Sequence, residues 1–458
     1  MISIVLQDAI IKSIIGVQKK NSDAYRCSRF VLRKDAKEGE LLYHTLTCEL
    51  IFLSPEETDE SVLDELISRW FYVPEESDDY AFARKVKRLR QLVYRADAKK
   101  KMHLPTERYW ILTTTNCNAH CFYCHEHGIP PMHMSQQTAR DVVQYIEKQS
   151  AKKQIHIMWY GGEPLINTEI IDTISAGIRE KGIEYASSMI SNGFAFDAPM
   201  VQKAVDLWCL KEVQITLDGL EATYNKVKSY SAREEGSPFY RVLNNITLLL
   251  EKSVNVKIRL NIDSYNAEEL SELADLLIER FKEYSGFSVY SAPLMEDCLG
   301  TTNKRSDLQR QQVYEAHYCL SEKLGSAGVL FKTELARAMR SEMRCIAVSN
   351  VKVIFPQGQL AFCHDYAQGV LSGSIYEEEP EEKERMEYTK CLPEKDECRT
   401  CVKYPQCVRL EKCFNNKCNK EMIQEWIWKT QNEMLWEYEQ WIEDGKHSTS
   451  SVNMMRET

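Results

Sequence analysis

The sequence predicts an α/β fold, a partial (β/α)6 barrel with a small N-terminal α/β domain and a cysteine-rich C-terminal domain. Three observations predict it. Strand-like runs alternate with helical patterns between residues 105 and 295, the first hundred residues follow a different pattern, and the cysteines cluster after position 345. With 458 residues, 43% of them hydrophobic, the chain can bury a large core and should hold several domains.

Composition excludes several functional classes. The net charge of −10 and the pI near 5.7 argue against a nucleic-acid partner, whose phosphates are usually met by a basic surface. No run of 18 apolar residues and no signal peptide is found, so we expect a cytoplasmic protein without a membrane partner. In that reducing compartment the 16 cysteines favour metal binding over disulfides.

Residues 1–100 predict a separate, winged α/β domain. Strand-like alternation covers residues 25–33 and 40–53, and apolar residues recur at helical spacing over 59–71. The Lys- and Arg-rich stretch 88–103 predicts a solvated helix that leads to the barrel, to which we assign no partner.

The barrel, residues 101–300, is predicted from six strands. They cover residues 109–115, 155–160, 187–191, 212–217, 256–262 and 287–291, with helices between most of them, for example over 136–149 and 169–179. Strands that alternate with helices form a parallel sheet, and barrel enzymes build their sites at the carboxyl ends of the strands. We therefore expect the residues that follow each strand to share one rim.

Three cysteines follow the first strand as Cys117-x3-Cys121-x2-Cys124. Such a triple can ligate three corners of an iron–sulfur cube and leave the fourth iron without a protein ligand. Zinc is the weaker interpretation, because structural zinc sites need four ligands and no second cysteine pair lies nearby. His120, His125 and His127 could supply a fourth ligand, but solvated histidines on a polar loop are the simpler explanation.

This triple, with Tyr123 before its last cysteine, resembles the cluster loop of the radical S-adenosylmethionine (SAM) enzymes. The resemblance implies a [4Fe-4S] cluster whose open iron chelates SAM, and an electron that splits SAM to a 5′-deoxyadenosyl radical, which takes a hydrogen atom from the substrate. It also implies the partial-barrel fold and an electron donor such as flavodoxin or ferredoxin.

Further motifs follow the next strands. Gly161 and Gly162 lack Cβ and allow a close backbone approach to a ligand, and the carboxylate of Glu163 can accept from an ammonium group. The resemblance assigns Gly-Gly-Glu-Pro to the methionyl amine of SAM. It assigns the ribose hydroxyls to Ser191 and Asn192.

Asp218, before Gly219, is a weaker candidate for the ribose, because Asp-Gly is also a common turn, and Asn261 is weaker still. Peptide-modifying and sulfatase-maturing members often continue with His-Asp or His-Asn and then Arg. This chain has Tyr-Asn-Lys-Val-Lys at 224–228 instead, which puts a transferred role for that segment in doubt.

The tail, residues 341–458, follows a predicted helical bridge at 301–340 and resembles the SPASM extension, which holds two auxiliary [4Fe-4S] clusters. Gly358 predicts a tight turn that returns the chain to the next cysteine. By resemblance the first auxiliary cluster takes Cys345, Cys363 and Cys413, and the second takes Cys398, Cys401, Cys407 and Cys418. Cys391 is a candidate fourth ligand of the first cluster, which could otherwise have an open site. A tail with two zinc sites is the alternative.

An amphipathic, aromatic-rich helix over 422–441 is expected to pack on the tail domain or on the barrel.

Together these resemblances predict an enzyme with three [4Fe-4S] clusters that matures a ribosomally made peptide by forming a thioether or carbon–carbon crosslink. The N-terminal domain would resemble a leader-peptide recognition domain, or would only pack on the barrel. The alternatives are a sulfatase maturase that makes formylglycine and a zinc-stabilised, non-catalytic peptide-binding protein. The separate N-terminal domain argues against the sulfatase branch.

Overall fold

The computed structural model describes residues 3–6, 13–55, 60–124, 126, 128–151, 154–231, 236–294, 305–331, 349–363, 371–377, 386–413, 418 and 420–443. These residues fall into two compact units. One contains the described residues of 1–96 and 390–458, and the other contains those of 97–332 and 345–389. The predicted domain boundaries stay predictions.

The second unit is built on six parallel strands that are hydrogen-bonded in chain order. They are β7 (Arg108–Thr114), β8 (Ile155–Gly161), β9 (Tyr185–Ser191), β10 (Leu210–Leu217), β11 (Asn255–Ile262) and β12 (Phe287–Pro293). Each lies within two residues of its predicted bounds, because buried parallel strands are short apolar runs between polar turns.

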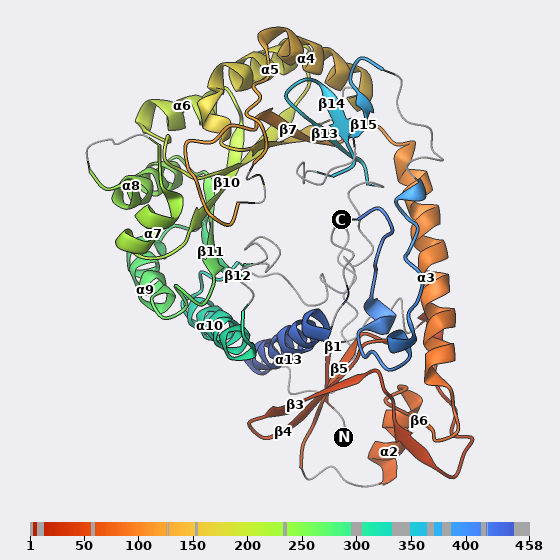
Figure 1. The fold of residues 1–458 in the computed structure, drawn as a ribbon. Coiled ribbons are helices and arrows are strands. Elements are labelled where there is room, and N and C mark those ends of the chain that lie inside the picture. Colours follow the sequence, from red (N-terminus) through yellow and green to blue (C-terminus); the bar gives the residue numbers. More distant parts are fainter. Residues whose placement is uncertain are drawn as a thin grey trace. The chain divides into compact units, whose positions relative to one another are not determined.

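Helices cover the outer face of this curved sheet (Figure 1). They are α4 (Gln136–Ser150), α5 (Thr168–Glu180), α6 (Ala198–Asp206), α7 (Glu221–Lys228), α8 (Pro238–Glu251), α9 (Leu270–Phe281) and α10 (Asp307–Ser326). Their apolar faces and the strands share one core, in which Trp159 and Trp208 are fully buried. The predicted fold class, α/β with a partial barrel, is confirmed.

Three further strands extend the sheet beyond β7. The first, β13 (Val351–Ile354), pairs with β7 in parallel, and β14 (Gln359–Ala361) and β15 (Leu371–Ser374) follow antiparallel. The turn between β13 and β14 needs Gly358, whose φ is +81°. The predicted tight turn is therefore present, and the strands before and after it add to the barrel sheet.

The first unit contains an antiparallel sheet in the order β1 (Ser3–Leu6), β5 (Glu49–Leu53), β4 (Gly39–His44) and β3 (Val31–Ala36). The strands β2 (Tyr25–Cys27) and β6 (Tyr72–Pro74) pair separately. In the chain, the helix α2 (Glu60–Ser68) lies between β5 and β6, and the long helix α3 (Asp79–Met102) follows β6. Each of the two predicted strands is split in two. The break in the second falls at residues 45–48, where Cys48 has a φ of +56° and its N–H bonds to the carbonyl of His44.

The C-terminal helix α13 (Lys420–Glu443) packs on this N-terminal sheet. Met434 and Tyr438 are buried against Leu41, Tyr43 and Leu50, and Tyr438 stacks on Phe52 with 4.5 Å between ring centres. The helix was predicted, and so was its packing on the tail, since Val402 belongs to the same cluster and Lys403 Nζ lies 5.3 Å from the ring centre of Trp426. Its packing on the N-terminal sheet was not predicted, and it arises because alternate residues of β3, β4 and β5 present an apolar face that needs a cover.

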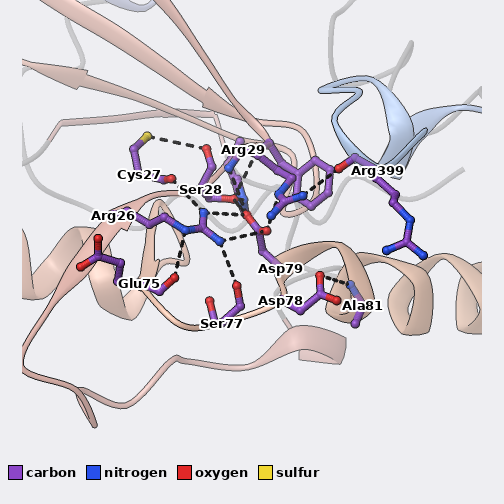
Figure 2. A network of polar contacts seen from close by, with 12 residues as sticks. Arg26, Cys27, Ser28, Arg29, Glu75, Ser77, Asp78, Asp79, Ala81 and Arg399 are labelled. Atoms are coloured by element: carbon purple, nitrogen blue, oxygen red, sulfur yellow. Dashed lines mark hydrogen bonds and ion pairs between the residues drawn. The ribbon is translucent and has the colours of Figure 1, made fainter. Parts of the chain in front are cut away.

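A polar network ties the start of α3 to its surroundings (Figure 2). Asp79, buried at 4% exposure, pairs with Arg26 at 3.2 Å and with Arg29 at 2.5 Å. Burial opposes the charge of Asp79, but hydrogen bonds and the two guanidinium groups lower its pKa. Arg29 also donates to the carbonyl oxygen of Arg399 at 2.8 Å, so the network reaches the cysteine-rich tail.

Among the described helices, none combines the length and the apolar character needed to cross a membrane.

Candidate active site

The cysteine loop, residues 115–124, begins where β7 ends. The hydroxyl of Thr114 accepts from the N–H of Asn116 at 3.0 Å and donates to the carbonyl of Met132 at 2.8 Å. The hydroxyl of Thr115 contacts the same residue, because it accepts from the N–H of Met132 at 2.8 Å. These contacts fix the start of the loop at the carboxyl end of the first barrel strand.

Cys117, Cys121 and Cys124 lie together on this loop as free, half-buried thiols. Burial raises the pKa of Cys117 to about 12, with smaller contributions from Glu163 and from the two other cysteines. Burial likewise raises the pKa of Cys124 to about 11. Over the described residues, no three His, Cys, Asp or Glu side chains converge on a single-ion site. Three thiols on one short loop are the donors that an iron–sulfur cluster takes from the chain, so the donor set fits a cluster.

Gly161 and Gly162 approach the cysteine loop itself. A Cβ on Gly161 would lie 2.1 Å from the carbonyl oxygen of Thr114, and one on Gly162 would lie 2.3 Å from that of Asn116. The N–H of Gly162 donates to Thr114 O at 3.1 Å, and that of Glu163 to Asn116 O at 2.9 Å. The two glycines therefore let the end of β8 pack directly against the loop backbone. From the sequence, we expected their missing Cβ atoms to make room for a ligand.

The side chain of Glu163 is buried, with 1% exposure, and turned toward the end of β9. Its Oε1 accepts from the Ser191 hydroxyl at 2.9 Å, and its Oε2 accepts from the N–H of Asn192 at 2.7 Å. Burial raises the pKa of Glu163 to about 7, although these donors oppose the shift. Glu163, Ser191 and Asn192 thus form one hydrogen-bonded group across two adjacent strand ends.

Asn192 joins that group to the cysteine loop. Its Nδ2 donates to Asn118 Oδ1 at 2.7 Å, and its Oδ1 accepts from the N–H of Phe194 at 3.0 Å. The sequence motifs after β7, β8 and β9 are therefore brought together at one rim, as their positions at strand ends predict.

Asp218, which is fully buried, meets the partly buried Tyr123 in a second polar group. The Tyr123 hydroxyl donates to Asp218 Oδ1 at 2.7 Å, and Asn261 Nδ2 donates to the same oxygen at 2.9 Å. The other oxygen, Asp218 Oδ2, lies 2.8 Å from the ammonium of Lys228. Both carboxylate oxygens of the predicted ribose ligand thus have partners within the chain.

Lys228 is the residue that the sequence interpretation missed. Its side chain is only 2% exposed. Burial alone would lower the pKa of Lys228, but Asp218 and Tyr123 raise it well above its ordinary value, so it is a buried cation. The available signal was the cation two residues after Lys226, in the segment where the resemblance expects an arginine, but neither residue type nor spacing shows that it faces inward.

The tail cysteines that the structure describes fall in both units. Cys398, Cys401, Cys407 and Cys418 belong to the first unit, where burial raises the pKa of Cys401 and the three others add to the shift. These four predicted ligands are therefore neighbours. Cys391, in the same unit, accepts from Gln91 Nε2 at 3.1 Å. Burial raises the pKa of Cys391, and the nearby Cys407 adds to this shift. Cys413 also belongs to this unit, Cys363 belongs to the second, and Cys345 lies outside the described residues.

Comparison with known proteins gives the class. Residues 111–277 match the model of the Radical SAM superfamily. Fe-coproporphyrin III synthase of Methanosarcina barkeri is 24% identical over 166 residues, which are 36% of this chain and 39% of that protein. A probable GTP 3′,8-cyclase of Methanocaldococcus jannaschii is 28% identical over 170 residues, 36% of this chain and 53% of that protein. The matches thus span about half or less of these relatives.

Solved structures resemble more of the chain. The protein anSMEcpe with bound AdoMet matches with a TM-score of 0.55 and 14% identity, over 74% of this chain and 98% of the other. Streptococcus suis SuiB bound to precursor peptide SuiA matches with a TM-score of 0.52 and 13% identity, over 84% and 95%. At such identities the likeness concerns the fold alone.

The family match covers β7 to α9, the part of the chain that carries the cysteine loop and the next three rim motifs. Residues 111–277 of the chain therefore form a radical SAM domain. Such a domain implies SAM and one [4Fe-4S] cluster as cofactors.

Proposed function

We propose that this enzyme matures a ribosomally made precursor peptide, abstracting a hydrogen atom from one of its residues and forming a thioether or carbon–carbon crosslink. The second electron of this two-electron oxidation would pass to an auxiliary cluster, and the second proton would be released. The observation that carries the proposal is the fold likeness to SuiB, a protein solved with a precursor peptide, because it extends over 84% of this chain. Because the barrel, residues 101–300, accounts for fewer than half of the 458 residues, a likeness of that extent must include most of the chain beyond the barrel.

The thiolates of Cys117, Cys121 and Cys124 would hold the cluster, and Gly161, Gly162, Glu163, Ser191 and Asn192 would form the wall beside SAM. When bound, the reduced cluster and SAM supply a 5′-deoxyadenosyl radical. The contribution of the chain is to place the three thiols on one rigid loop and to hold a buried carboxylate next to it. The hydrogen bonds of Glu163 to Ser191 and Asn192 keep that wall ordered before any ligand arrives.

Two auxiliary clusters are part of the proposal. Cys398, Cys401, Cys407 and Cys418 are neighbours in the first unit, which supports them as the ligands of one cluster. Cys345, Cys363 and Cys413 are proposed for the other, with Cys391 as the candidate fourth ligand. An electron donor such as flavodoxin or ferredoxin is proposed to reduce the first cluster.

The N-terminal sheet is proposed to bind the leader of the peptide. Its two edge strands, β1 and β3, are the places where an extended peptide could add a strand by backbone hydrogen bonding. One of its faces is covered by α13 and the other packs on α2, so the edges are the surface that the sheet itself offers.

The test is anaerobic co-expression of the full chain with short peptides encoded beside its gene, followed by mass measurement of the intact peptide. Loss of two hydrogens per event supports a crosslink, and thiol alkylation then separates a thioether from a carbon–carbon bond. An unchanged mass with deuterium uptake from heavy water would instead mean epimerisation. The matched control is the chain in which Cys117, Cys121 and Cys124 are all alanine.

A second candidate is sulfatase maturation, in which a Cys or Ser of a protein becomes formylglycine. It is favoured by the fold likeness to anSMEcpe, which was solved with AdoMet and the Cp18Cys peptide and matches 74% of this chain with a TM-score of 0.54. A chain that leaves every neighbouring peptide unchanged but produces an aldehyde on a cysteine-containing sulfatase peptide would support this candidate and contradict crosslinking.

A further inference from the structure

Beneath the cysteine loop lies a closed cluster of polar side chains formed by Lys228, Asp218, Tyr123, Thr216 and Asn261. The ammonium of Lys228 has three hydrogens to donate and three oxygen partners. It lies 2.8 Å from Asp218 Oδ2, 2.7 Å from Thr216 Oγ1 and 3.3 Å from the Tyr123 hydroxyl. The ammonium thus donates hydrogen bonds to Thr216 and Tyr123 and forms an ion pair with Asp218, all within the chain.

Three of the five side chains in this cluster are buried, and Tyr123 and Thr216 are partly buried. The side chain of Asp218 is fully buried, that of Lys228 is 2% exposed, and Asn261 is 2% exposed. Asn261 Nδ2 donates to the Tyr123 hydroxyl at 3.0 Å as well as to Asp218, and Asn266 Nδ2 donates to the carbonyl of Asp218 at 2.7 Å. In such surroundings an ion pair is strong only while both partners remain, because removal of one leaves an uncompensated buried charge.

Three chain segments that are distant in sequence meet in this cluster. Tyr123 belongs to the cysteine loop, Thr216 and Asp218 to the end of β10, and Lys228 to the end of α7. Lys228 holds the loop a second time through its backbone, because its carbonyl accepts from the N–H of His120 at 2.7 Å. Beside it, the N–H of Ser231 donates to the carbonyl of Asn118 at 2.9 Å.

We propose that Lys228 is a positioning residue: paired with Asp218, it fixes the Tyr123 hydroxyl and thereby the cysteine loop between Cys121 and Cys124. In this arrangement Asp218 anchors the loop, and its carboxylate is not free for a ribose. The inference rests on the proposed function only in so far as this loop is the one that holds the cluster and faces SAM.

The first readout needs no cofactor. In the iron-free chain, Lys228→Met should raise the rate at which Cys121 and Cys124 are alkylated by about tenfold, the usual size of an effect transmitted through a supporting residue. Lys228→Arg keeps the cation and should stay close to the wild type. Tyr123→Phe removes the link without leaving a buried charge, so it tests the same idea in a chain that should fold. Its effect and that of Lys228→Met should not add, because both break one path.

The matched control is Lys257→Met. Lys257 pairs with Glu212 at 2.9 Å, is 15% exposed and lies near the beginning of β11, away from the strand ends that carry the loop. Its loss should leave the alkylation rates of Cys121 and Cys124 unchanged.

The second readout is the dissociation constant of SAM, measured by equilibrium dialysis on the reconstituted chain. We expect it to rise about tenfold in Lys228→Met while iron content stays near that of the wild type, as for other supporting residues of metal sites. Unchanged alkylation rates in both Lys228→Met and Tyr123→Phe, or an equal increase in Lys257→Met, would overturn the inference. A wild-type chain that carries iron but binds no SAM would contradict the proposed function, and the alkylation rates would still decide the role of Lys228.

Discussion

Glu163 shows how a single buried side chain can order the site before a ligand binds. Its carboxylate accepts three hydrogen bonds, from Ser191, from the backbone of Asn192 and from the N–H of Leu165 at 3.2 Å. Burial still outweighs these donors and raises its pKa from 4.5 to about 7. The charged form that orders the strand end is therefore held at a cost in stability near neutral pH.

That cost can be measured as a pH dependence. Because the pKa of Glu163 is raised on folding, the folded chain binds a proton that the unfolded chain has released, between pH 4.5 and about 7. The free energy of unfolding of the iron-free chain should fall over this window, by about 3 kcal/mol in total from this group, and level off above it. In Glu163→Gln the same window should be flatter, as measured by urea unfolding at a series of pH values. Equal slopes in the two chains would contradict the assignment.

At the residue scale, the sequence predicts where the site residues lie better than it predicts what their side chains contact. The order of Cys117, Gly161, Ser191 and Asp218 along the chain was enough to place them at one rim, because each lies at or shortly after the carboxyl end of a strand. The pairing of Asp218 with Lys228 could not be predicted in the same way. It depends on how the end of α7 returns over the strand ends, which local spacing does not encode.

At the scale of elements, the contact between the end of β8 and the cysteine loop is a backbone contact. Gly162 leaves no room for a Cβ, since that atom would meet Asn116 O at 2.3 Å and Thr115 O at 2.7 Å. Both neighbours are main-chain atoms of the loop, so they cannot rotate away as a flexible side chain would. Strand and loop must shift together if a side chain is introduced.

We therefore expect Gly162→Ala to lower the free energy of unfolding by roughly 3 kcal/mol, the upper range for overpacking a well-packed contact. The matched control is Gly182→Ala, because Gly182 has a φ of +68° but nothing within 4 Å of an added Cβ. That control should cost only about 1 kcal/mol of backbone strain. Urea unfolding of the two iron-free variants measures the difference, and equal losses would show that the loop tolerates displacement.

The elements that the sequence predicted well are those with a strong period. The strands β7 to β12 are short apolar runs, and α4 and α5 have clean amphipathic faces, so their bounds were predicted within one or two residues. The break at residues 45–48 was missed because the alternation of residues 40–53 continues through it. The contact of α13 with the tail was predicted, but its contact with the N-terminal sheet was missed, since an aromatic stripe indicates burial but does not identify every surface that buries it.

At the scale of the whole molecule, the tail is shared between the two units. The strands β13 to β15 extend the barrel sheet, whereas residues 390–413 belong with the N-terminal sheet. The Thr45 hydroxyl donates to the carbonyl of Val402 at 2.7 Å, and Lys87 Nζ donates to that of Tyr404 at 3.1 Å. The loop that carries Cys398 and Cys401 is therefore built on the unit that we propose to bind the leader, an arrangement that the order of the motifs did not suggest.

The most direct test of the central claim is the formation of 5′-deoxyadenosine from SAM by the anaerobically reconstituted chain, with dithionite as the reductant. The account predicts that the wild type forms it and that the variant with Cys117, Cys121 and Cys124 all replaced by alanine does not, while that variant keeps the iron and sulfide bound by the tail. Undiminished 5′-deoxyadenosine in the variant would contradict the assignment of the cysteine loop. A colourless wild type that carries stoichiometric zinc and no labile sulfide would contradict the iron–sulfur account as a whole.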